Sequence, residues 1–358
     1  GSEMCIRDSD YTIISKKDSV SQNTLRVGNV LSFEDRYYQF DQSRQDDYFG
    51  EAFKTTNLRD KVTLEDFKAS VYANYFNDKL GSLRFSIGMA DLNYGYDKVV
   101  VLDDETIPNR IKDKVVSITG NYENDFGNLN IKGRLSSNIS GEFAGNALSA
   151  EATYTINRDN AFSFGVSSNS RRPNYNFLLY QSDYTNYNWY NDYKNVTTTA
   201  LSANVALKKI VNLNIDYTSI GNYTYFQQLS EKSTKPFQSD GSVNYLNILL
   251  TKELKYGKFA LANTIAYQNV IDGEDILNVP QLTTRNTLYF TSHFFKKALF
   301  LQTGVTLKYF TKYNMNAYDP LLAEFYVQNG QEFGGFPMLD FFVNAKIQQT
   351  RIYFKAEH

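Results

Sequence analysis

The sequence predicts an all-β protein: an antiparallel, up-and-down meander of about fifteen visible strands, sixteen or more in the full protein, closed as a transmembrane β-barrel. Composition is the first of three observations behind this prediction. The 358 residues include 28 Tyr and 26 Phe but only 6 Pro, and aromatic residues favour strands whereas proline disfavours them. The second is a two-residue alternation of apolar and polar side chains. The third is an alternation of short and long connections along the chain.

Composition also excludes several classes of protein. Lys plus Arg total 37 against 39 for Asp plus Glu, a net charge of −2, which is unlike a strongly basic nucleic-acid-binding protein. The chain has no run of about 18 apolar residues, which each span of a helical membrane bundle would require. One cysteine, Cys5, and two histidines, His293 and His358, are too few for a Cys/His zinc site.

The strands are predicted from period-two alternation, which places different surroundings on the two faces of a strand. The clearest cases are residues 129–136, 211–218, 299–308 and 339–347. The best helix candidate, residues 57–70, is short and falls in a loop. The predicted strands are 24–41, 62–76, 82–100, 114–126, 128–140, 144–156, 161–172, 195–207, 211–228, 242–255, 258–270, 283–296, 298–313, 337–347 and 349–358.

The connections between these strands indicate a membrane barrel. Tight turns, several with the Gly, Asn and Asp residues of short hairpins, alternate with long polar segments. Outer-membrane barrels have short periplasmic turns, long outer loops and strands that are apolar outside and polar inside. A polar lumen explains how such a protein can have a mean hydropathy of −0.45. The long connections are 42–61, 101–113, 173–194, 229–241, 271–282 and 314–336.

Two groups of residues are candidates for function. Charged residues on the polar face of the strands are expected to line the lumen. Aromatic residues of the 173–194 connection could stack on a sugar, although the alternative is an extracellular loop with girdle aromatics. The candidate lumen charges are Lys132, Arg134, Asp216, Arg285, Lys308, Lys346, Arg351 and Lys355, and the candidate aromatic loop residues are Tyr175, Tyr187, Trp189, Tyr190 and Tyr193.

Other constellations favour an ordinary structural role. Asp91, Asn93, Gly95 and Asp97 are spaced like a calcium loop, but the glycine is one position early and Leu102 stands where a bidentate glutamate would be needed. Ser292-His293 has no acidic partner near it in sequence. We therefore expect no metal, no cofactor and no catalytic activity.

Both ends of the chain are abrupt. Residues 1–9, GSEMCIRDS, resemble a translated sequencing adapter, the alternative being a natural N-terminal tail. The stretch RIYFKAEH at residues 351–358 is typical of the first half of a strand. We expect residues 10–358 to form a single outer-membrane β-barrel domain that lacks both of its ends, because no linker-like segment divides it.

The C-terminal segment FPMLDFFVNAKIQQTRIYFKAEH, residues 336–358, resembles the C-terminal region of the putative porin family of Bacteroidota-type outer membranes. The matching features are Phe336-Pro337, Leu339-Asp340, the strand with Asn344-Ala345-Lys346, a tight turn, and the strand from Arg351 to His358. From about Leu25 onward, the remainder is similar in its hairpin rhythm and aromatic content. The resemblance implies an integral outer-membrane barrel with channel function and no catalytic residues.

The expected function is therefore that of a porin-like channel for small hydrophilic solutes. Two alternatives stay open: the barrel of an active outer-membrane transport receptor, or a non-transport adhesin or secretion-associated barrel. The expected partners are outer-membrane lipid, the barrel-assembly machinery and small hydrophilic solutes, with no nucleic acid. The sequence does not identify the solute.

Overall fold

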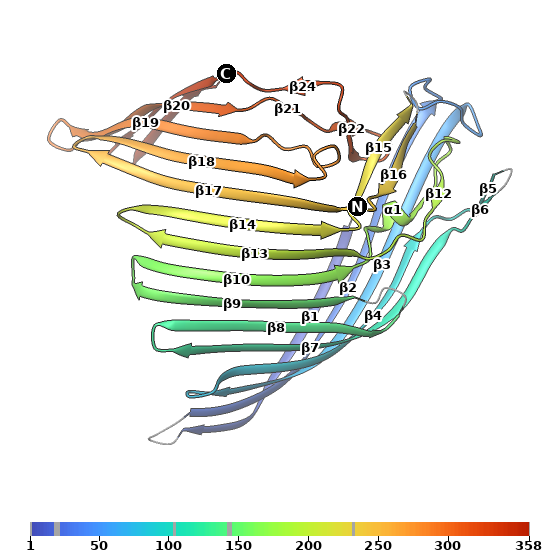
Figure 1. Cartoon of the computed structure of the whole chain (residues 1–358), viewed down its shortest axis with the longest axis horizontal. Helices are drawn as coiled ribbons and strands as arrows, with labels where there is room; N and C mark the ends of the chain where they lie inside the picture. The colour runs from blue at the N-terminus through green and yellow to red at the C-terminus, as the bar shows by residue number, and fades with distance from the viewer. Residues whose placement is uncertain (1, 18–21, 103–104, 142–144, 231–232, 358) are drawn as a thin grey trace.

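The computed structural model describes residues 2–17, 22–102, 105–141, 145–230 and 233–357. Its main element is one sixteen-stranded antiparallel sheet in which each strand pairs with the next along the chain (Figure 1). The all-β meander predicted from sequence is thus confirmed. The strands are β1 (Ser2–Lys17), β2 (Gln22–Arg44), β3 (Thr56–Asn77), β4 (Gly81–Gly95), β7 (Arg110–Phe126), β8 (Leu129–Ser140), β9 (Asn146–Asn157), β10 (Asn160–Arg171), β13 (Val196–Leu207), β14 (Val211–Gly221), β17 (Ser242–Tyr256), β18 (Phe259–Asp272), β19 (Leu282–Phe294), β20 (Leu299–Phe310), β25 (Met338–Ile347) and β26 (Thr350–Ala356).

The expected set of about fifteen strands misses β1. This strand pairs with β2 from Ser2 to Lys17. Its alternation is irregular, because Asp8 falls on the same face as Ile6 whereas Arg7 falls on the same face as Tyr11. Neither face is consistently apolar, so the period-two signal is lost. The adapter origin of the first nine residues stays a prediction, and Gly1 and His358 lie outside the described residues.

The long connections lie at one end of the sheet and the tight turns at the other, as Figure 1 shows. The long connections contain short elements of their own. These are β5 (Val100–Val101), β6 (Thr106–Ile107), α1 (Tyr175–Leu178), β11 (Leu179–Tyr180), β12 (Trp189–Tyr190), β15 (Thr224–Ser230), β16 (Ser233–Gln238), β21 (Tyr313–Asn314), β22 (Ala317–Asp319), β23 (Glu324–Val327) and β24 (Glu332–Phe333). No helix in the described residues is long and apolar enough to cross a bilayer.

Predicted and observed strand boundaries differ by a few residues at several strands, and three of the differences have a clear local cause. The strand expected at 211–228 leaves the sheet after Gly221, because Asn222 adopts a left-handed φ of 55°. The strand expected at 82–100 ends at Gly95, whose φ of 149° an L side chain rarely adopts. Residues 57–70, the best helix candidate, belong to strand β3. In each case a local backbone conformation or sheet pairing outweighs the sequence pattern.

The sheet has two edges, and its buried core lies at one end. Among the described residues no ladder joins β1 to β26. The main cluster of buried apolar side chains is contributed by the long connections and the strand ends beside them, including Phe49, Tyr96, Tyr180 and Leu321. The strands thus form a wall, and their long connections form a compact body at one end of it.

Candidate functional site

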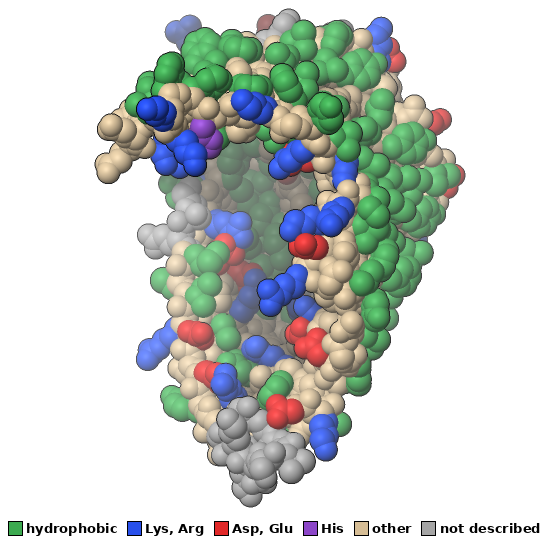
Figure 2. All heavy atoms as spheres, turned by 90° about the vertical axis from the view of Figure 1, so that its left-hand side faces the viewer, with side chains coloured by type: hydrophobic (Ala, Val, Ile, Leu, Met, Phe, Trp, Pro, Cys, Tyr) green, Lys and Arg blue, Asp and Glu red, His purple; other side chains and the backbone are tan. Residues whose placement is uncertain are grey.

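Register separates the sheet into an apolar face and a polar face, because cross-strand partners lie on the same side. Phe164 pairs with Ala203, Ile215 with Ile248, and Leu288 with Val305. Figure 2 shows hydrophobic side chains over the outside and charged side chains around a hollow interior. Exposed apolar residues on the outer face are Ile87, Leu135, Leu148, Phe164, Leu201, Ile215, Leu288, Val305, Phe341 and Phe354.

The opposite side, here called the lumen face, carries all eight candidate charges. Arg134 is opposite Ser149, and Lys132 is opposite Glu151. Following the ladders from Glu151 through Gly165 and Ser202 leads to Asp216. In the last four strands the candidate charges also lie on the face opposite to the apolar residues Leu288, Val305 and Phe341. The ladder pairs on this face are Arg285 with Lys308, Lys346 with Arg351, and Lys355 with Phe342. That these side chains line a conducting pore stays a prediction.

A hollow of about 600 Å³ lies against the lumen face between β3 and β13. Its charged lining comprises Arg84, Glu123, Lys132, Arg134 and Glu151. Lys132 Nζ lies 3.2 Å from Glu123 Oε1, and the Arg84 guanidinium lies 3.7 Å from the centre of the Tyr72 ring. This wall therefore presents both signs of charge, which suits hydrogen bonding to polar solutes.

Residues 172–195, here called the cap loop, connect β10 to β13 and fold onto the lumen face. Arg84 faces the lumen, and so does its partner on β3, Asn74. Leu58 and Asp60 are separated from Asn74 by an even number of residues along the same strand, so their side chains also face the lumen. Both are buried, and Asp60 accepts hydrogen bonds from the Ser182 hydroxyl and from the Asp183 backbone N–H, the latter at 2.7 Å. The loop therefore crosses the lumen from β10 to β3.

Asp183 joins the cap loop to three separate segments. Its side chain is 4% exposed and accepts from Lys54 Nζ at 2.8 Å and from Lys98 Nζ at 2.6 Å. The Arg59 backbone N–H donates to Oδ2 at 2.7 Å. Burial opposes the charged carboxylate, but these donors outweigh it, and the pKa of Asp183 lies below its ordinary value. The ionised form is therefore the one that holds the loop.

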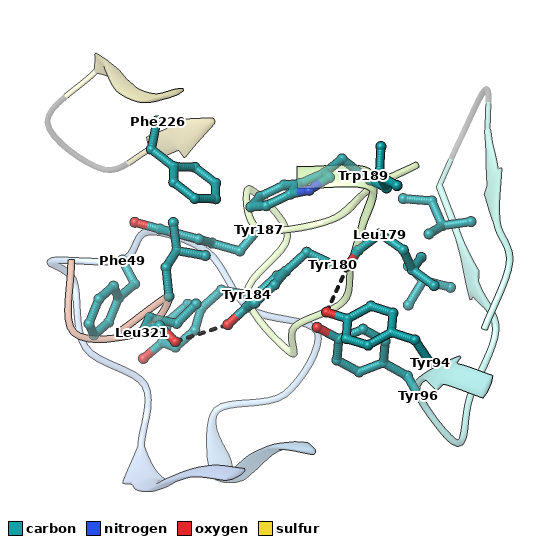
Figure 3. Close-up of a cluster of buried hydrophobic side chains, with 14 of the residues drawn as sticks. Phe49, Tyr94, Tyr96, Leu179, Tyr180, Tyr184, Tyr187, Trp189, Phe226 and Leu321 are labelled. Carbon is teal, nitrogen blue, oxygen red and sulfur yellow. Dashed lines mark hydrogen bonds between the residues drawn. The ribbon is translucent and has the colours of Figure 1, made fainter. Parts of the chain in front are cut away.

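Aromatic side chains fill the space beneath the cap loop (Figure 3). The Tyr94 hydroxyl donates to the Leu179 carbonyl at 3.3 Å, and the Tyr180 hydroxyl donates to the Leu321 carbonyl at 2.9 Å. Tyr180 and Trp189 stack with ring centroids 5.0 Å apart. The Tyr94 and Tyr180 phenols thus find partners while their rings pack, and the loops from β4, β10 and β20 are held together.

The structure places the five candidate aromatic residues in different surroundings. Tyr187 and Trp189 are buried in the cap, where the Tyr187 hydroxyl donates to Asp319 Oδ2 at 2.9 Å. Tyr175 and Tyr193 are half-buried, whereas Tyr190 is 49% exposed. Of the five, Tyr190 has the most accessible ring, and sugar stacking by this loop stays a prediction.

Two ionisable groups at the margin of the cap are shifted toward their neutral forms. Lys235 Nζ lies 5.2 Å over the Trp189 ring, and burial lowers the pKa of this lysine, with Glu105 opposing the shift. Glu324 accepts from Asn176 Nδ2 at 2.6 Å, but burial raises the pKa of Glu324. The packing of the cap is therefore sensitive to pH through more than one group.

The calcium-like spacing of Asp91, Asn93, Gly95 and Asp97 does not form a cluster of free oxygen ligands. Asp91 lies 3.3 Å from Lys114 Nζ, and Asp97 lies 3.1 Å from Arg110. Asn93 donates to Glu65 Oε2 at 2.9 Å. Within the described ranges no group of three or more His, Cys, Asp and Glu side chains could hold a metal ion.

Sequence reasoning missed the residues that fasten the cap. It also missed Arg84, a charged residue of the lumen wall, although the alternation of apolar and polar residues along β4 could have placed it on the lumen face. In contrast, Asp60 and Asp183 meet across 123 residues, and Lys54 and Lys98 come from two further loops. No local pattern carries that information, because the contact depends on how the sheet curves.

Comparison with known proteins agrees with this architecture. Residues 6–358 match the protein family described as "Putative porin", and no curated protein matches the chain. Among solved structures, a mutant of the ferric enterobactin receptor PfeA from Pseudomonas aeruginosa is similar, with a TM-score of 0.62 and 10% identity over 94% of this chain and 55% of the receptor.

Two further structures show the same fold. The siderophore receptor PirA from Acinetobacter baumannii has a TM-score of 0.57 and 12% identity, over 98% of this chain and 58% of its own. The copper transporter OprC has a TM-score of 0.64 and 11% identity, over 94% of this chain and 58% of its own. The chain therefore spans less than two thirds of the length of these proteins, and identities this low show the fold alone. The family match over nearly the whole chain and the two-faced sheet lead to one conclusion: this chain belongs to the putative porin family and is an integral outer-membrane β-barrel protein.

Proposed function

We propose that the protein is a channel through which small hydrophilic solutes cross the outer membrane. The observation that carries the proposal is the continuous polar lumen face, on which Ser, Thr, Asn and charged side chains alternate with the apolar residues of the outer face. Such a face hydrates a pore and offers hydrogen bonds to solutes. In this proposal outer-membrane lipid contacts the apolar face, and the barrel-assembly machinery inserts the strands.

The proposal includes no catalytic activity. The Ser292 hydroxyl donates to the backbone carbonyl of His293, and the His293 ring packs edge-on against Phe300 with centroids 5.1 Å apart. Neither side chain is placed as a nucleophile with its base. The polar residues of the lumen serve instead as hydrogen-bonding and charged groups along the pore.

Reconstitution tests the channel directly. Protein isolated from outer membranes should give stepwise ionic conductance in planar bilayers and should make liposomes permeable to small sugars. A variant in which Asn176 to Asn191 is replaced by a short Gly-Ser linker should conduct more, because the cap loop crosses the lumen. A membrane-inserted protein that never conducts, with or without its cap loop, would contradict the proposal.

A second candidate is the barrel of an active transport receptor. It is favoured by the fold shared with proteins named as siderophore receptors and a copper transporter, and by a cap that covers one end of the lumen. A receptor takes up its ligand only while the cell is energised, whereas a channel does not need energy. Uptake that stops when a protonophore is added would favour the receptor. The third class, an adhesin or secretion-associated barrel, has no comparable observation in its favour.

A further inference from the structure

The last four strands of the sheet have an uneven charge on their lumen face. Within the described strands β19, β20, β25 and β26, this face carries five basic side chains and one carboxylate, Asp340. The basic residues are Arg285, Lys308, Lys346, Arg351 and Lys355. The whole chain is almost neutral, so this wall concentrates positive charge locally.

The basic residues stand at three levels along the wall. Lys346 and Arg351 are direct partners beside the tight turn, and Lys355 is the partner of Phe342, four residues along β25 from Lys346. Arg285 and Lys308 are direct partners near the long connections, and Lys308 lies four residues from the Phe342 partner, Gly304. At about 3.3 Å per residue, successive levels are about 13 Å apart.

Two of these levels place like charges directly opposite each other, which destabilises a sheet. Lys308 is compensated, because its Nζ lies 2.5 Å from Oδ2 of buried Asp340. Lys355 forms an ion pair with Glu357. Among the ion pairs of the described residues, none includes Arg285, Lys346 or Arg351. A sheet without a use for these cations would be more stable with one of each pair neutral.

The wall between β4 and β13 provides the contrast. There Lys132 lies 3.2 Å from Glu123 and is opposite Glu151 in the ladder. Cations and carboxylates therefore alternate, and their fields largely cancel. Positive charge is in excess on the lumen face of β19, β20, β25 and β26 but not on this wall. Figure 2 shows Lys and Arg side chains, with Asp and Glu side chains among them, around the mouth at the tight-turn end.

We propose that the lumen face of β19, β20, β25 and β26 is a track that selects small anionic solutes, such as inorganic anions and short carboxylates, over cations of the same size. The inference rests on the proposed channel and names its substrate class. Fixed cations along one wall raise the local concentration of anions. Successive levels are about 13 Å apart, so an anion midway between two of them is about 6.5 Å from each, which is within the Debye length of about 8 Å at physiological ionic strength.

Reversal potentials across a KCl gradient test the track with protein isolated from outer membranes. The wild type should pass chloride in preference to potassium, more strongly at low salt. The double variant Lys346→Gln, Arg351→Gln should lose most of this preference while it still conducts. Because these substitutions remove a like-charge pair, they should not weaken the strand pairing, and heat-modifiable migration on gels checks that they have folded.

A matched control changes the same net charge on the other face. The ladder register places Lys114 and Lys252 on the outer face. The double variant Lys114→Gln, Lys252→Gln should therefore keep the wild-type anion preference. Conduction without anion preference, or equal loss in both double variants, would overturn the track and leave the channel standing. A wild-type protein that does not conduct would overturn the channel and the track together.

Discussion

Asp183 shows how a single carboxylate fastens a loop across a lumen. Its carboxylate oxygens form ion pairs with two lysines and accept a hydrogen bond from a backbone N–H, and these three partners come from segments that are far apart in sequence. The two lysines are about half exposed and can be solvated when they are released, whereas Asp183 is almost fully buried. The cost of losing these contacts is therefore set mainly by the buried partner, because desolvated hydrogen bonds to charged groups contribute most.

We expect Asp183→Asn to loosen the cap by about 1.5–3 kcal/mol, the range for hydrogen bonds to charged groups. The chain provides its own reporter, because its single tryptophan, Trp189, is buried in the cap loop. The variant should show a red-shifted emission and faster acrylamide quenching. Asp192→Asn is the control, since this carboxylate is 92% exposed and pairs with Arg172. Unchanged fluorescence in Asp183→Asn would show that the remaining contacts of the cap hold the loop without this carboxylate.

The same residue predicts acid sensitivity of the cap. The folded-state pKa of Asp183 is lowered, so its contribution is fully present above the ordinary carboxylate pKa of about 3.9 and is lost as pH falls through the lowered value. Glu324 acts in the opposite sense, because its raised pKa means that protonation favours the packed state. Trp189 emission should shift reversibly at strongly acidic pH in the wild type, and Asp183→Asn should lack that transition.

Among the elements, the strands were predictable and the cap was not. Strand β14 begins at Val211, as expected, because Leu213 and Ile215 alternate with Asn214 and Asp216. It ends early because one residue, Asn222, turns left-handed and donates to the Asn195 carbonyl at 2.9 Å. Alternation reports which face of a strand is apolar. It carries no information on a turn whose partner comes from another loop.

The two faces of β14 can be distinguished by one charge. Ile215 lies on the outer face opposite Ile248, whereas Asn214 lies on the lumen face opposite Asn204. Ile215→Arg should destabilise the folded barrel by roughly 2–4 kcal/mol if the site is near the bilayer midplane. Asn214→Arg should be tolerated, because its side chain reaches water. The measurement is the urea midpoint of reconstituted protein, and similar losses in both variants would indicate a packed core on both sides.

For the whole molecule, the sequence predicted the two-faced sheet but not how its long connections meet. The eight candidate charges share one face because strand parity is a local property that every ladder preserves. The cap depends on contacts such as Tyr180 to Leu321, separated by 141 residues. Their geometry follows from the curvature of the sheet, which no short segment encodes. Composition indicated only that many aromatic residues were available for such packing.

The separation of tight turns from long connections predicts the orientation of the molecule in the membrane. In outer-membrane barrels the short turns face the periplasm and the long loops face outside. Arg158 lies in the tight turn between β9 and β10, and Asp240 lies in the connection between β14 and β17, and both are exposed. After replacement of the exposed cysteine of the chain by Cys5→Ser, an impermeant thiol reagent on intact cells should label Asp240→Cys and spare Arg158→Cys. Both should react once the outer membrane is permeabilised. Labelling of Arg158→Cys alone on intact cells would invert the orientation, and it would place the cap at the periplasmic end, where it could not screen solutes entering from outside.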